Sequence, residues 1–165
     1  MSGDWSQQAQ HGKLPKNNHT MKAVTSTWFE CAVRYGRTTE EGPEKKVTET
    51  YVVEAMSFTE AEAKIIRELS PFTPGELEIK KITPMSISEI FFSDRDADDS
   101  WFKCKLAFIT IDEKTDKEKR SAVSYLVQAD SLGTALNYVV QEMGKTSIDY
   151  VASNISETKI MDVYR

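Results

Sequence analysis

The chain has 165 residues, of which 28% are charged and 39% are hydrophobic, and its formal net charge is −5. A negative balance disfavours generic binding to nucleic-acid phosphates, for which a basic surface is expected. No stretch approaches the length of a membrane span, and the first residues lack the apolar run of a signal peptide. We therefore expect a cytoplasmic protein that contacts neither nucleic acid nor a membrane.

The first 20 residues are polar and unpatterned, which predicts a disordered tail over residues 1–20. The sequence leaves open whether translation starts at Met1 or at Met21. Both histidines, His11 and His19, lie in this tail, so the predicted folded region contains none. Catalytic Ser-His-Asp and Cys-His arrangements and the usual histidine-containing zinc sites are thereby excluded from that region.

The folded region is expected to open with a strand over residues 28–35. Phe29 and Cys31 alternate with Trp28 and Glu30, which is the period-two pattern of a half-buried strand. A charged interval that contains Gly42 and Pro43 predicts an exposed hairpin connection, and a second strand follows over residues 51–55.

A helix is predicted next. Ser57 can cap it, Glu60 completes a capping box, and an apolar stripe follows at helical spacing: Phe58, Ala61, Ile65, Ile66 and Leu69. Residues 77–92 are rich in β-branched and aromatic side chains, and Pro84 interrupts them as it would at a sheet edge or a bulge. The unit is therefore β-β-α-β.

The same pattern recurs about 73 residues later, a fixed separation that is typical of duplicated units. WFEC at 28–31 returns as WFKC at 101–104, and YVVEAMSFTEA at 51–61 returns as YLVQADSLGTA at 125–135. We predict an α+β protein made by tandem duplication, with mostly antiparallel sheet and two helices packed on it. Its repeats span residues 21–93 and 100–165, and an acidic linker, 94–99, joins them.

Each unit of about 70 residues is near the lower limit for a self-sufficient core, so the two are expected to pack together. They would form either one six-stranded antiparallel sheet or two facing units about a pseudo-twofold axis.

The strings WFEC…YVVEAMSFTEAEA…SEIFF and DSWFKCKLAFITIDEKTDKEKR…ISETKIMDVY resemble a domain-of-unknown-function family found in anaerobic gut bacteria and their phages. The resemblance covers about residues 22–165. It implies a small cytoplasmic or phage-encoded protein and supplies no catalytic or ligand-binding residue.

Motifs for cofactors and metals are missing, and we expect neither. The few glycines form no phosphate-binding loop. Asp94, Asp96 and Asp98 have the spacing that opens a calcium loop, but Asp99 stands where that loop needs Gly and Lys105 where it needs Glu. The acidic stretch is therefore interpreted as a solvated linker. Cys31 and Cys104 are interpreted as small buried hydrophobes rather than reactive thiols.

Two pairs of equivalent residues are candidates for function. Trp28 and Trp101 lie on the strand face opposite the core stripe, where they either pack between the repeats or form part of a binding surface. Glu89 and Asp162 could act as acid and base, but no spacing or partner residue supports that role, and the favoured interpretation is that both are exposed, outward-facing strand residues.

Three functions remain open. The first, which we expect, is a non-enzymatic interaction module that presents an extended sheet face or edge to a protein partner or to another copy of itself and uses Trp28 and Trp101. The second is a binder of a small anion such as a nucleotide signal, between the repeats, with Arg34, Arg37, Lys103 and Lys105 as candidate contacts. The third, an enzyme that uses carboxylates and lysines alone, has no positive support.

Overall fold

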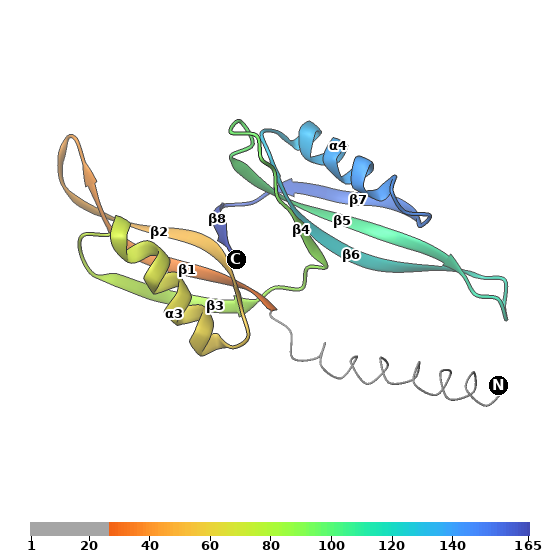
Figure 1. Ribbon diagram of the computed structural model, residues 1–165, viewed down its shortest axis with the longest axis horizontal. Helices are drawn as coiled ribbons and strands as arrows, with labels where there is room; N and C mark the ends of the chain where they lie inside the picture. Colours follow the sequence, from red (N-terminus) through yellow and green to blue (C-terminus); the bar gives the residue numbers. More distant parts are fainter. Residues whose placement is uncertain (1–26) are drawn as a thin grey trace, which may run out of the picture.

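The computed structural model describes residues 27–165, which form an α+β fold of eight strands and two α-helices (Figure 1). The first half contains β1 (Thr27–Thr39), β2 (Gly42–Ala55), α3 (Phe58–Leu69), a short 3-10 turn (Ser70–Phe72), β3 (Leu77–Pro84) and β4 (Glu89–Phe91). The second half contains β5 (Ser100–Ile111), β6 (Glu118–Ala129), α4 (Leu132–Met143), β7 (Asp149–Glu157) and β8 (Ile160–Tyr164). The expectations for the tail over residues 1–20 and for the start at Met21 lie outside the described residues.

The strands form two four-stranded sheets that exchange their last strands. One sheet has the order β3-β1-β2-β8 and the other β4-β6-β5-β7. The β1–β2, β1–β3, β5–β6 and β5–β7 pairs are antiparallel, whereas β8 runs parallel to β2 and β4 parallel to β6. Each sheet therefore takes three strands from one half of the chain and its fourth from the other half. Figure 1 shows that the chain leaves β7 through a short connection and that β8 lies beside β2 in the other sheet.

This arrangement corrects two expectations. The single six-stranded sheet is wrong, because the strands divide into two sheets. The unit of three strands is also wrong, because residues 77–92 and the equivalent last segment of the second half each break into two strands that enter different sheets. The breaks are anchored alike: the amide of Met85 donates to the carbonyl of Trp28 (2.7 Å), and the amide of Thr158 donates to the carbonyl of Trp101 (2.9 Å).

Both helices begin where their cap residues predict. The hydroxyl of Ser57 accepts a hydrogen bond from the amide of Glu60 (3.1 Å), and that of Ser131 accepts one from the amide of Thr134 (3.2 Å). Each helix turns three apolar residues inward: Ala61, Ile65 and Leu69 on α3, and Ala135, Val139 and Met143 on α4. Within residues 27–165, no helix is long and apolar enough to cross a membrane.

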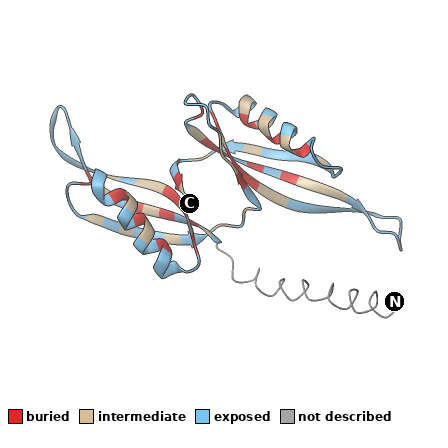
Figure 2. Cartoon of the chain, in the orientation of Figure 1, coloured by how far each residue is buried: buried red, intermediate tan, exposed pale blue. Residues whose placement is uncertain are grey.

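A separate hydrophobic core lies between each helix and its sheet, and Figure 2 shows the buried positions on the facing surfaces. Cys31 and Cys104 occupy equivalent places in these cores, and both are free and 0% exposed. Burial, with a smaller contribution from the charge of Glu30, raises the pKa of Cys31 to about 11. Burial likewise raises the pKa of Cys104. Both cysteines are thus buried small side chains, as predicted.

A third core joins the two halves on the sheet faces that the helices leave uncovered. Its buried members are Val52, Ile90, Trp101, Leu126, Ile160 and Val163. Ile90 lies on β4, and Ile160 and Val163 lie on β8, so the exchanged strands supply half of this cluster. Strand exchange and the third core therefore depend on each other.

Candidate functional site

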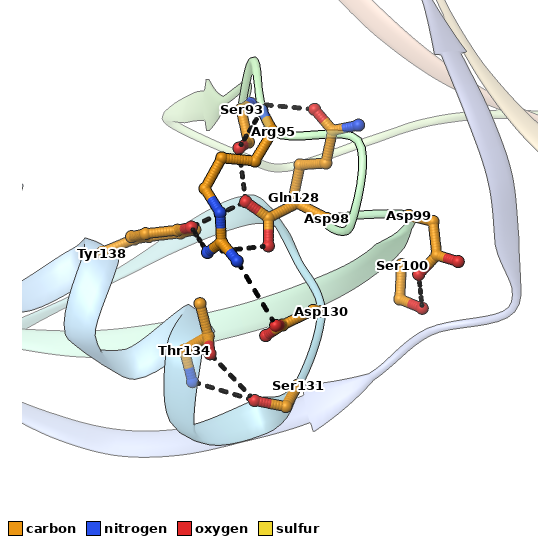
Figure 3. A network of polar contacts seen from close by, with 10 residues as sticks. All are labelled: Ser93, Arg95, Asp98, Asp99, Ser100, Gln128, Asp130, Ser131, Thr134 and Tyr138. Atoms are coloured by element: carbon orange, nitrogen blue, oxygen red, sulfur yellow. Dashed lines mark hydrogen bonds and ion pairs between the residues drawn. The ribbon is translucent and has the colours of Figure 1, made fainter.

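The linker between the halves is fixed by a buried carboxylate (Figure 3). The Asp98 side chain is almost fully buried, and its Oδ2 accepts hydrogen bonds from the hydroxyls of Ser93 (2.5 Å) and Tyr138 (2.6 Å). Tyr138 lies on α4, forty residues further along the chain. The interpretation of residues 94–99 as a wholly solvated linker is therefore wrong at Asp98, because two hydroxyls replace its water.

The charge of Asp98 is maintained despite burial. Desolvation opposes ionisation, but the hydrogen bonds from Ser93 and Tyr138 and the positive charge of Arg95 outweigh it, so the pKa of Asp98 lies below its ordinary value. Arg95 Nη1 lies 3.6 Å from Asp98 Oδ1, which has no hydrogen-bond partner among the described residues. Asp98 is thus an ionised anchor for the linker.

Arg95 extends this network to the surface of the second half. Its Nη1 donates to the Tyr138 hydroxyl (2.8 Å), and its Nη2 lies 3.8 Å from Asp130 Oδ2. The side chain is about half exposed and borders a recess of about 230 Å³ beside Phe91 and Tyr138. Because its charge already faces two carboxylates, Arg95 serves to hold the linker more than to attract an anion.

The two tryptophans of the repeated string have different environments. Trp101 is 2% exposed and lies in the core between the halves. Trp28 is half-buried at the edge of that core, and its ring is 6.4 Å from that of Phe92. Phe92 also meets Trp101 edge to face at 5.6 Å, and the guanidinium of Arg165 lies 3.7 Å above its ring. Trp101 therefore packs between the halves and presents no ring to solvent.

The four candidate anion contacts do not converge. Arg34 lies opposite Glu78 on β3, and Arg37 Nη1 lies 4.0 Å from Glu49 Oε1. Lys103 and Lys105 share one face of β5, in the other sheet.

Of these four, Lys103 alone lines the recess between the halves. This recess has a volume of about 250 Å³ and is bordered by Glu30, Thr50, Met85, Lys103, Leu126, Thr158, Lys159 and Ile160. Within residues 27–165, neither Lys103 nor Lys159 forms an ion pair.

The two carboxylates that could have formed a catalytic pair are apart in the fold. Glu89 lies on β4, opposite Tyr125 in one sheet, and Asp162 lies on β8, opposite Tyr51 in the other. Both are exposed. In the described part of the chain, no three His, Cys, Asp or Glu side chains gather in a way that could hold a metal ion.

The outer edges of the two sheets differ in chemistry. β3 and β7 occupy equivalent edge positions, and within residues 27–165 neither pairs with a strand on its outer side. β3 has the sequence LEIKKITP, with charged residues in its middle and Pro84 at its end. β7 has the sequence DYVASNISE, with charges only at Asp149 and Glu157. Seven uncharged residues thus line an open sheet edge.

A family model matches residues 27–165, which is the whole of the described chain. Its description is a domain of unknown function, DUF4494. The chain belongs to the DUF4494 family. No curated protein and no solved structure matches this DUF4494 chain. The family description gives no source, so the expected occurrence in gut bacteria and phages stays a prediction.

Two features of this DUF4494 protein were missed by sequence reasoning. The role of Asp98 has no local signal, because its partner Tyr138 comes from a distant helix. The uncharged run of β7 is visible in the sequence, but its place at a sheet edge follows only from the pairing with β5.

Proposed function

We propose that this DUF4494 protein is a non-enzymatic binding module that holds an extended segment of a protein partner along the outer edge of β7. The observation that carries the proposal is the uncharged run of residues 150–156 on an edge strand. An edge strand presents a row of backbone N–H and C=O groups on its open side, and adding a strand satisfies them.

The comparison with β3 makes the β7 edge distinctive. Natural sheets protect their edges with lysine, proline and bulges, and β3 carries Lys80, Lys81 and Pro84. Each edge strand has one unpaired residue in its register, Lys80 on β3 and Ser153 on β7. Because the bulge is common to both edges, the absence of charge and proline from the middle of β7 is what distinguishes them.

A photo-crosslinker placed at each edge tests this proposal in the producing cells. Val151 is 41% exposed on β7, and Lys81 is its control on β3. We expect a crosslinked partner from position 151 and none from position 81. Asn154→Lys, which adds a charge to the exposed β7 edge, should abolish the crosslink, whereas Thr83→Lys on β3 should not. Equal capture from both positions, or capture that Asn154→Lys leaves unchanged, would refute strand addition at β7.

A second candidate function is the binding of a small anion between the halves. It is favoured by the recess that Lys103 and Lys159 share, since neither ammonium forms an ion pair within residues 27–165, although Glu30 also borders the recess. A panel of nucleotides and pyrophosphate should raise the melting temperature of the native chain and of Lys105→Gln, but not that of Lys103→Gln. If no compound in the panel shifts the melting temperature of the native chain, this function is refuted.

We also propose that the two halves arose by duplication of one unit. Support comes from the equal order of β-β-α-β-β elements and from the matched pairing of the exchanged strands. The aromatic contacts match as well: Tyr51 stacks on Tyr164 at 6.0 Å, and Tyr125 stacks on Phe91 at 5.0 Å. A unit that cannot complete its own sheet fits an origin as a strand-exchanged pair.

A further inference from the structure

We propose that the segment held by β7 has a β-prone, uncharged stretch of about seven residues with a basic residue at each end. This inference rests on the proposed function and adds the chemistry of the partner. It follows from the charges at the ends of β7, from the side chains that overhang its edge, and from the unfavourable pairing of two copies of the strand.

The charges of β7 lie at its two ends and are exposed. Asp149 begins the strand and Glu157 ends it, with seven uncharged residues between them. Their neighbours across the sheet on β5 are Ile109 and Phe102, which carry no charge. Within residues 27–165, neither carboxylate forms an ion pair. A strand added on the outer side would therefore supply the first cross-strand charge that either carboxylate meets.

Side chains above the edge favour an uncharged middle for the added strand. On α4, Tyr138 turns toward Asp98 and the linker. Val140 follows two residues later, about 200° around the helix axis, so it lies on the opposite flank of α4. Because the linker leads out of β4, at the far edge of the sheet, that opposite flank faces β7. Val140 is 47% exposed and would cover alternate residues of a strand laid beside β7.

The other face of the edge carries one exposed apolar side chain, that of Val151. Val151 lies opposite Ala107 of β5 and is 41% exposed. Side chains alternate between the faces of a strand, so an added strand would meet Val151 on one face and Val140 on the other. A charge in its middle would lose hydration against one of these side chains, whereas a charge at its end would meet Asp149 or Glu157.

The same charges disfavour a second copy of the chain as the occupant. Two β7 strands paired antiparallel about Ser153 would place Asp149 of each opposite Glu157 of the other. Parallel pairing in register would place each carboxylate opposite its own copy. Like charges directly opposite each other destabilise a strand pair. Basic residues at the same places would convert both repulsions into attractions.

Three synthetic peptides test this inference by NMR titration of the full chain. All share one seven-residue core of valine and threonine, flanked at both ends by lysine, by serine or by glutamate. We expect the lysine-flanked peptide to bind at least about tenfold more tightly than the glutamate-flanked one, with shifts centred on β7. The doubly reversed variant Asp149→Lys/Glu157→Lys should invert this order, and Asn154→Lys should weaken all three.

The possible results distinguish the proposed basic ends of the partner from strand addition at β7 itself. Equal affinity for the three peptides would overturn the role of the end charges and leave strand addition standing. Failure of every peptide to bind, together with no crosslink at position 151, would overturn both. A chain that dimerises in sedimentation equilibrium, and stops doing so in Asn154→Lys, would replace the basic partner with a second copy.

Discussion

Trp101→Ala should sharply destabilise the protein, whereas Trp28→Ala should have a much smaller effect. Trp101 is 2% exposed in the core between the halves, and Phe92 meets its ring edge to face. Truncation of a buried tryptophan costs about 3–5 kcal/mol, as lost transfer free energy and as an unfilled cavity. For a chain of this size, that cost corresponds to a fall of roughly 10 °C or more in melting temperature.

The equivalent residue is the matched control. Trp28 is only half-buried, so its truncation should cost about 1–2 kcal/mol and lower the melting temperature by a few degrees. Both variants are compared by thermal unfolding monitored by circular dichroism, with urea unfolding as a second measure of stability. Equal losses, or a loss of only a few degrees in Trp101→Ala, would refute a core in which the two halves depend on this ring.

Three further predictions follow from the buried groups and from the strand exchange. The pKa of Asp98 is lower in the folded chain than the value of about 3.9 expected after unfolding, so its stabilisation is complete above that pH and is lost as the pH falls through the folded value. Asp98→Asn should therefore lower the free energy of unfolding at pH 7 by about 1–3 kcal/mol. As the pH falls below about 4, the variant should lose less stability than the native chain. If both lose the same amount, the acid-induced loss comes from other groups. Ellman's reagent should label neither Cys31 nor Cys104 in the folded chain at pH 8 and both after denaturation, because the thiols are buried and their pKa values are raised; labelling without denaturant would contradict this. Separate fragments 21–93 and 94–165 should each lack stable structure and fold when mixed, since each sheet needs a strand from the other half, and a fragment that folds alone would contradict the exchange.

The elements could be read from the sequence because their signals are local. Alternation between Phe29, Cys31 and their polar neighbours marks β1, and the capping serines Ser57 and Ser131 mark the starts of the helices. The exchange of β4 and β8 could not be read in this way. A hydrophobic pattern tells which face of a strand is buried but not which strand lies beside it, and Ile90 would be buried equally well in either sheet.

The candidate site was predictable only in part, for the same reason. The alternation of the strand placed Trp101 on the face opposite the core stripe, where the sequence predicted either packing between the halves or a binding surface. In the structure, the Trp101 ring packs between the halves. The charged run at 94–99 gave no sign that Asp98 is buried. Burial of an aspartate carboxylate is favourable only when hydrogen-bond donors from other parts of the chain reach it. Tyr138 is such a donor, and its spacing from Asp98 carries no signal in the sequence.

The two halves share an order of elements but differ where they meet solvent. Lys80 and Lys81 occupy the edge of the first sheet, and the equivalent edge of the second sheet carries Ser153 and Asn154. If edge chemistry served only to prevent aggregation, both edges would need the same protection, since each is exposed along its outer side. An edge with an uncharged middle that occurs in one half alone, with acids at its two ends, fits the proposed partner strand better than a need of the fold. The shared core therefore accounts for the architecture, and the difference between β3 and β7 is where function should be sought.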